Sequence, residues 1–183
     1  MHSLDVAVTQ WMNGFAGRSA TLDCLMISIS IVGVPILVFA VIIQWWFPRP
    51  DPSNRHVLLA AGLSFLLGLA LNQLILLFVH RIRPYDSGIT HLLIGPSADY
   101  SFPSDHATAT FAIAATFLLR GKRGCGIAFS IAALLMIVSR VYVGTHYASD
   151  VVGGAVTGII AAIFVRLVYW EGTRADRFVT GIL

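Results

Sequence analysis

Charged residues are scarce in this sequence. Asp, Glu, Lys and Arg make up 11% of its 183 residues, whereas soluble domains usually carry about 25%. Hydrophobic residues account for 57% of the chain. The composition excludes an ordinary water-soluble domain and predicts an all-α fold, a polytopic membrane helix bundle. The length leads us to expect a single domain over residues 1–183, without an appended soluble module.

Lysine is almost missing. Lys122 is the single lysine, and the other basic residues are all arginines. No basic run is long enough to indicate nucleic-acid binding, so we expect no nucleic-acid partner. Arginine supplies a planar, permanently charged fork that fits phosphate oxygens. The basic side chains of this chain are therefore better suited to phosphate groups at a membrane than to a nucleic acid.

Cysteine is also rare, and a targeting segment is not apparent. Cys24 and Cys125 lie near the starts of two different apolar runs. The topology described below places them at opposite membrane faces, so we expect no disulfide between them. The first twenty residues lack a basic start and a continuous apolar stretch, and we therefore expect no cleaved signal peptide.

Long apolar runs dominate the remainder of the chain. Each is close to the roughly 20 residues that a helix needs to cross a bilayer, and backbone amides in hydrocarbon must be satisfied within the segment, so we expect helices. The five predicted spans are Leu22–Trp46, Val57–Val79, Ser104–Leu119, Cys125–Val143 and Val151–Trp170. The third run is short for a full span.

The N-terminal segment has a different pattern. Its apolar residues recur at helical spacing and are Leu4, Val8, Trp11, Met12 and Phe15. Asp5, Thr9 and Asn13 lie between them. This pattern predicts an amphipathic helix that lies in the membrane interface. A surface helix that packs on the bundle fits the pattern equally well.

The basic residues indicate how the bundle is oriented. Five spans place the two termini on opposite faces, and most basic residues fall on the C-terminal face. These are Arg49, Arg55, Arg120, Lys122, Arg123, Arg174 and Arg177. Because positive charge marks the cytoplasmic side, the N-terminal face should be outside. Trp45–Trp46 and Tyr169–Trp170 end spans at the cytoplasmic face, as an aromatic belt would.

Three polar clusters fall on the N-terminal face. They are Arg81-Ile82-Arg83-Pro84 after the second span, Pro103-Ser104-Asp105-His106 at the start of the third, and Ser139-Arg140 with His146 and Asp150 between the fourth and fifth. The clusters are distant in sequence, but the number of spans between them returns each one to the same face. We therefore predict that they form a shared site.

The residue types in these clusters suit phosphate chemistry. Ser104 and the amides after it form a helix N-terminus, which binds anions through unpaired N–H groups and the helix dipole. Arg83 and Arg140 can neutralise phosphoryl oxygens and stabilise the charge of a five-coordinate transition state. The sequence therefore predicts a binding site for a phosphoryl group.

Histidines and a carboxylate supply the expected chemistry. His146 and Asp150 are four residues apart, so they share a face if this stretch is helical. The carboxylate can then fix the tautomer of the imidazole, which is the arrangement of an activated nucleophile. His106 is free to protonate the departing oxygen.

Other interpretations of these residues are possible. An interfacial arginine often only anchors a lipid headgroup, and a His–Asp pair is often structural. His106, His146 and Asp150 could bind a metal, but no chelating spacing links them and the arginines would repel a cation. We therefore expect no metal and no cofactor. A small transporter would also bury Arg, His and Asp in a bundle, but it normally shows paired broken helices in two halves, and no repeat is visible.

Together the three clusters resemble the signatures of the type-2 phosphatidic acid phosphatase superfamily. Those signatures are a lysine followed at a distance by Arg-Pro, then Pro-Ser-Gly-His, then Ser-Arg…His…Asp. The family lysine corresponds to Leu76, seven residues before Arg83, so one phosphate-binding charge is missing. Arg81, or less readily His80, is expected to replace it. The glycine of the second signature corresponds to Asp105.

Both departures resemble the bacitracin-resistance type of undecaprenyl-diphosphatase, as does the segment Ser97–His106, Ser-Ala-Asp-Tyr-Ser-Phe-Pro-Ser-Asp-His. The resemblance implies hydrolysis of undecaprenyl diphosphate to the monophosphate at the outer face of the bacterial cytoplasmic membrane. It implies that His146 forms a phosphohistidine, that Asp150 orients it and that His106 donates the proton. The phosphate-binding residues are then Arg81, Arg83, Ser104, Asp105 and Arg140.

The resemblance leaves the lipid open. Phosphatidylglycerol phosphate, phosphatidic acid and lipid A are alternative substrates, because the sequence does not determine the tail or the headgroup. The expected partners are a polyprenyl or other lipid phosphate and the surrounding membrane lipids. Neither the oligomeric state nor the role of the N-terminal segment follows from the sequence.

Overall fold

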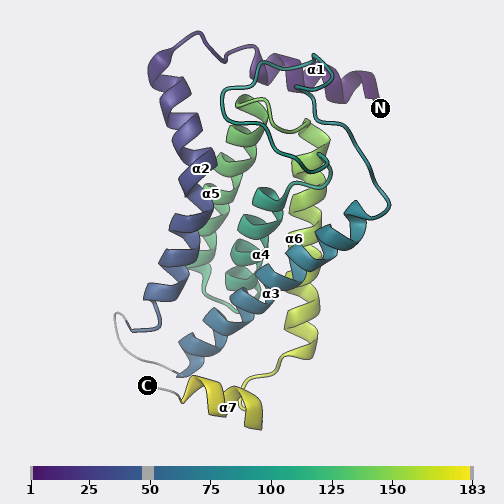
Figure 1. Ribbon diagram of the computed structural model, residues 1–183. Coiled ribbons are helices and arrows are strands. Elements are labelled where there is room, and N and C mark those ends of the chain that lie inside the picture. Colours follow the sequence, from purple (N-terminus) through teal and green to yellow (C-terminus); the bar gives the residue numbers. More distant parts are fainter. Residues whose placement is uncertain (1, 47–51, 182–183) are drawn as a thin grey trace.

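The computed structural model describes residues 2–46 and 52–181, which form helices joined by loops and contain no strand (Figure 1). In chain order they are α1 (His2–Asn13), α2 (Ala20–Ile43), α3 (Pro52–Leu76), α4 (Asp105–Leu119), α5 (Arg123–Tyr142), α6 (Ala148–Val168) and α7 (Arg174–Thr180). The predicted all-α bundle is confirmed. Arg49, one of the basic residues assigned to the cytoplasmic face, lies outside the described residues.

Four helices, α2, α3, α5 and α6, are long and apolar enough to cross a membrane. The remaining predicted span, α4, has 15 residues and is about 22 Å long at a rise of about 1.5 Å per residue, less than the roughly 30 Å of a hydrocarbon core. It packs on α3, α5 and α6, and most of its residues are buried. A helix that longer helices enclose can be short, because they shield its ends from lipid.

Glycines set the close approach of α4 to α6. A Cβ atom at Gly154 would lie 2.4 Å from the carbonyl oxygen of Ser104, and one at Gly158 would lie 2.4 Å from that of Thr108. The hydroxyl of Thr108 donates to the Gly154 carbonyl over 3.0 Å. Since both glycines lie one to two turns after Asp150, this packing holds the start of α4 beside the start of α6.

Helix α1 lies across the end of the bundle at which α6 begins (Figure 1). Its polar face points inward: Thr9 is fully buried, and the Asn13 amide donates to the carbonyl oxygens of Tyr142 over 2.8 Å and His91 over 2.9 Å. Leu4 and Trp11 are 70% and 68% exposed. The helix therefore packs on the bundle through its polar side and leaves its apolar side free for lipid.

Helix α7 closes the opposite end of the bundle (Figure 1). The Asp176 carboxylate accepts hydrogen bonds from the Tyr169 hydroxyl over 2.5 Å and lies 2.7 Å from His56 Nδ1. Burial opposes ionisation of Asp176, but its hydrogen bonds with Tyr169 and His56 outweigh this and lower its pKa. The contacts fasten α7 to the beginning of α3.

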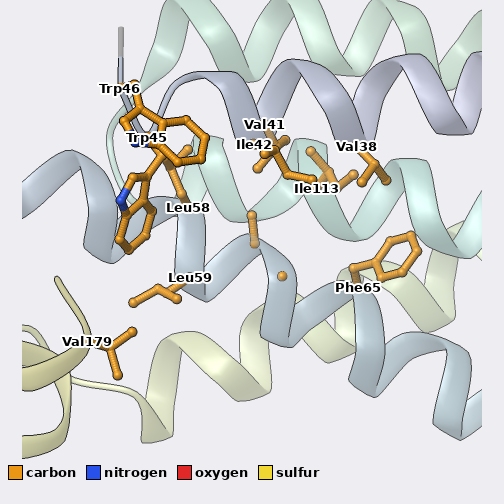
Figure 2. A pocket seen from close by; sticks show the side chains of 12 residues that line it. Val38, Val41, Ile42, Trp45, Trp46, Leu58, Leu59, Phe65, Ile113 and Val179 are labelled. Atoms are coloured by element: carbon orange, nitrogen blue, oxygen red, sulfur yellow. The ribbon is translucent and has the colours of Figure 1, made fainter. Parts of the chain in front are cut away.

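An apolar pocket of about 540 Å³ lies near this end, between α2 and α3 (Figure 2). Its lining includes Trp45 and Trp46, which follow α2, Leu58 of α3 and Val179 of α7. It is remote from α1 and holds none of the three predicted polar clusters, so it is not part of the candidate site.

We predict that Gly158→Ala destabilises the protein, because the added methyl group meets the backbone of Thr108. Overpacking of this kind costs about 1–3 kcal/mol, and displacement of α4 should also lower activity. The matched control is Gly62→Ala, also within a helix, where a Cβ atom meets nothing within 4 Å. Thermal unfolding in detergent should give a lower Tm for Gly158→Ala alone. Equal Tm values for the two variants would show that α4 and α6 do not pack this closely.

Candidate active site

The three predicted clusters meet at the end of the bundle that α1 covers. Arg83 belongs to the loop before α4, Ser104 caps α4, Arg140 lies in the last turn of α5, and Asp150 in the first turn of α6. The backbone N–H of Ser104 donates to the carbonyl of Asp150 over 3.1 Å. Arg83 Nη1 lies 3.4 Å from Nε2 of His146. Residues far apart in sequence thus form one site.

His146 lies in the short loop between α5 and α6, and its side chain is buried. Its Nδ1 lies 2.8 Å from the carbonyl oxygen of Ser101. A carbonyl only accepts hydrogen bonds, so Nδ1 carries the proton and Nε2 carries the lone pair. Burial, with the positive charges of Arg140 and Arg83, lowers the pKa of His146 to about 4. The imidazole is therefore neutral at pH 7, with Nε2 available as a nucleophile.

Asp150 is fully buried and supports this loop through both carboxylate oxygens. Oδ2 accepts hydrogen bonds from the Ser101 hydroxyl over 2.5 Å and from the Tyr147 amide over 2.8 Å. The same oxygen is 3.7 Å from His146 Nδ1, which is beyond a hydrogen bond. Oδ1 accepts from Arg81 Nη1 over 2.6 Å. Asp150 therefore acts on the imidazole by its charge and by fixing Ser101, whose carbonyl makes the direct contact.

Arg83 is 4% exposed and is held by two loops. Its Nε and Nη2 donate to the backbone carbonyl and the side chain of Asp99, each over 2.9 Å. Its Nη1 donates to the carbonyl of Thr145 over 3.0 Å. These contacts keep a buried positive charge beside Nε2 of His146, where the negative charge of a phosphoryl group would develop.

Two predicted phosphate ligands carry buried donors that lack a partner. The Nε of Arg140 and the hydroxyl of Ser104 have no hydrogen-bond partner among the described residues, although Arg140 Nη1 donates to Ser30 over 2.6 Å. An unsatisfied buried polar group costs about 1–3 kcal/mol. Phosphoryl oxygens would supply the missing acceptors, so these atoms fit an anion.

His106 and Asp105 lie in the first turn of α4. The His106 ring makes no hydrogen bond with the described residues, and it lies within the electrostatic influence of His146, Arg83 and Arg140. One carboxylate oxygen of Asp105 accepts from the Asn72 amide over 2.7 Å. An ionised carboxylate only accepts, so Asp105 could bind phosphate through its backbone N–H rather than its side chain.

Arg81 lies on the far side of Asp150. Its guanidinium donates to Asp150, to Ser149 and to Asp5 of α1 over 2.5–2.6 Å, and it stacks on the Tyr147 ring with 3.8 Å to the centroid. The predicted contact of Arg81 with phosphate stays a prediction. Its observed partners place it behind Asp150, on the side away from His146.

Several supporting residues did not emerge from the sequence. Ser101 and Asp99 lie within the segment Ser97–His106, but their contacts depend on how that loop folds. Gly144 could have indicated the turn before His146 from the sequence. Its φ is +85°, and a Cβ atom there would lie 2.4 Å from the carbonyl oxygen of His91. A glycine two residues before a predicted catalytic histidine indicates a tight turn.

The described residues contain no group of three or more His, Cys, Asp or Glu side chains placed to hold a metal ion. His106, His146 and Asp150 lie in one region, but Asp150 is occupied by Arg81, Ser101 and Tyr147. The site is instead lined by arginines and by the start of a helix, both of which suit an anion.

Comparisons with known proteins bear on the family and the fold of the chain. A family model for the PAP2 superfamily matches residues 57–174. The chain is 36% identical to undecaprenyl-diphosphatase BcrC of Bacillus subtilis, covering 81% of this chain and 76% of that protein. Its fold is similar to the crystal structure of Aquifex aeolicus LpxE, with a TM-score of 0.73 and 23% identity over 88% of this chain and 94% of LpxE. It is also similar to a PAP2-type phosphatidylglycerolphosphate phosphatase from Bacillus subtilis, with a TM-score of 0.68 and 24% identity over 94% and 88% of the two chains.

We predict that the acid-side loss of phosphate-ester hydrolysis by this protein occurs only at strongly acidic pH. Because the pKa of His146 lies at about 4 rather than at the ordinary 6.5, Nε2 keeps its lone pair until the pH falls through about 4. The acid limb of kcat/KM should therefore lie near that value. The ionisation of the substrate, followed separately by ³¹P NMR, is the control. A decline that already centres on 6.5 and is not due to the substrate would contradict the assignment.

Proposed function

This chain belongs to the PAP2 superfamily, and from that premise we propose that it hydrolyses undecaprenyl diphosphate to undecaprenyl phosphate and phosphate. It is a membrane phosphatase. The similarity to BcrC, an undecaprenyl-diphosphatase, supports the choice of substrate. The observation that carries the proposal is the neutral His146, whose Nε2 lies beside the buried Arg83 while Arg140 and Ser104 hold donors without partners.

In the first step Nε2 of His146 attacks the terminal phosphorus. The bond from phosphorus to the bridging oxygen breaks, and undecaprenyl phosphate leaves with a proton from His106. The negative charge of the bound diphosphate favours the protonated form of His106. The Nδ1–H bond to the Ser101 carbonyl stabilises the positive imidazole ring of the phosphohistidine.

In the second step water hydrolyses the phosphohistidine. His106 is now neutral and takes a proton from the water as its oxygen attacks phosphorus. The bond between phosphorus and Nε2 breaks, phosphate leaves, and His146 returns to its starting tautomer. His106 ends this step protonated, ready to serve as the acid for the next substrate.

The charge on the phosphoryl oxygens is the main obstacle to both steps. Arg83, Arg140 and the Ser104 hydroxyl are the proposed ligands of these oxygens, with the backbone N–H groups at the start of α4, including that of Asp105. Fixed donors of this kind stabilise developing charge without reorganisation. Arg81 is proposed to replace the family lysine at Leu76 indirectly, by offsetting the negative charge of Asp150 beside the site.

The protein is an integral membrane protein, and we place its site at the outer face of the bacterial cytoplasmic membrane. Arg174 and Arg177 belong to α7, and Arg55 and Arg120 donate to carbonyls of Thr180 and Tyr169 near it. These positive charges gather at the end opposite the site, and positive charge favours the cytoplasm. This proposed orientation is consistent with a lipid substrate whose phosphate groups lie at the outer face of the membrane.

We predict that the purified protein in detergent releases phosphate from undecaprenyl diphosphate with excess chelator present. Its kcat/KM should exceed that for phosphatidic acid, phosphatidylglycerol phosphate or lipid A by about tenfold or more, the scale of discrimination that a few contacts provide. His146→Ala, as the control, should release none. Faster release from another lipid would assign that lipid as the substrate. Loss of activity on chelation, restored by a divalent ion, would contradict the metal-free chemistry.

A further inference from the structure

A cluster of four side chains joins α1 to the start of α6: Asp5, Arg81, Ser149 and Asp150, here called the α1 clamp. Asp5 Oδ2 accepts from Arg81 Nη2 over 2.5 Å and from the Ser149 hydroxyl over 2.6 Å. Asp5 Oδ1 accepts from the Ser149 amide over 2.8 Å. Arg81 Nη1 reaches Asp150 Oδ1 over 2.6 Å. Both nitrogens at the end of one guanidinium are thus bonded to carboxylates.

The clamp continues into the site without interruption. Asp150 accepts from the hydroxyl of Ser101 over 2.5 Å, and the carbonyl of Ser101 lies 2.8 Å from Nδ1 of His146. The path from Asp5 to the imidazole therefore runs through Arg81, Asp150 and Ser101. Each contact along it is of hydrogen-bond length.

The charges of the clamp give Asp5 more than a packing role. Arg81 pairs with two carboxylates, so Asp5 and Asp150 share one positive charge. Burial opposes ionisation of Asp5, but hydrogen bonds from Ser149 and Arg81 outweigh it and lower its pKa. Without Asp5, Arg81 would neutralise Asp150 alone and would lose the partner that fixes its second nitrogen.

Further hydrogen bonds of α1 fix its position next to the loop that contains His146. The Thr9 hydroxyl accepts from the Ala148 amide over 3.0 Å, and Asn13 bonds to the backbone at Tyr142 and His91. These contacts lie on both sides of the loop that contains His146. Helix α1 precedes the residues that match the family model, 57–174, so its contribution is additional to the part of the chain that the model covers.

We propose that Asp5 is a positioning residue of the active site, which holds Arg81 and Ser149 against Asp150 and so sets the orientation of His146. This inference rests on the proposed role of His146 as the nucleophile. Asp5 does not touch the reacting atoms. Its effect should therefore appear in the chemical step rather than in substrate binding.

The test compares Asp5→Asn with Asp86→Asn, a variant of an exposed carboxylate in the loop before α4. Asp5→Asn should lower kcat by about tenfold or more, the order expected for loss of a charge-assisted hydrogen bond, with KM within about twofold. Asp5→Glu, which keeps the charge, should recover part of the loss. Asp86→Asn should behave like the wild type. Equal activity of Asp5→Asn and Asp86→Asn would overturn the proposal.

A double-mutant cycle shows whether Asp5 acts through Arg81. Arg81→Ala should lower kcat/KM more than tenfold, because it also removes a charge-assisted hydrogen bond. The double variant, with Asp5→Ala added, should have nearly the same kcat/KM as Arg81→Ala alone. If the loss of kcat/KM in the double variant equals the product of the losses in the two single variants, the two residues act independently. That result would also overturn the proposal. If Asp5→Ala does not fold, Asp5→Glu and Arg81→Lys provide the same cycle.

The use of two substrates distinguishes a failure of the Asp5 proposal from a failure of the proposed function. Each variant is assayed on undecaprenyl diphosphate and on whichever phosphate ester the wild type cleaves fastest. If the wild type does not cleave undecaprenyl diphosphate, the proposed substrate fails, while the effect of Asp5 on kcat is still measured on the other ester.

Discussion

The hydrogen bond between Nδ1 of His146 and the carbonyl of Ser101 determines what the site can do. Because a carbonyl accepts only, this bond places the proton on Nδ1 and leaves the lone pair on Nε2, beside Arg83. The remaining contacts maintain it. Asp150 binds the hydroxyl of the same serine, and Arg81 binds Asp150. The proposed nucleophile is thus buried in a helix bundle and held by a series of polar partners, each hydrogen-bonded to the next.

This polar network is possible only because the helices around it come very close. Gly154 and Gly158 let the backbone of α6 touch that of α4, and Asn72 of α3 donates to Asp105 and Thr108 from the other side. The start of α4, whose first N–H groups have no partner among the described residues, is thereby held next to the start of α6. The apolar surfaces of the longer helices face outward, so the polar chemistry stays within the protein.

Much of the fold and part of the site could be predicted from the sequence. Apolar runs predicted α2 to α6 but not α7, and the number of spans between them predicted that Arg83, Ser104 and His146 share one face. Other features depend on tertiary packing. Asp5 and Ser149 are 144 residues apart, and no periodicity links them. Helix α1 has an amphipathic pattern, but the pattern does not reveal that its polar side packs inward, since polar residues normally face water.

The proposed mechanism requires that His146 becomes covalently phosphorylated. This phosphorylation can be detected by rapid quenching of a reaction with undecaprenyl diphosphate labelled in its terminal phosphate, followed by alkaline digestion and mass spectrometry. We expect phosphate on the nitrogen of His146, more of it in His106→Ala if the second step is slowed more than the first, and none in His146→Ala. Label on another residue, or turnover without labelled protein in wild type and His106→Ala alike, would show that His146 is not the nucleophile.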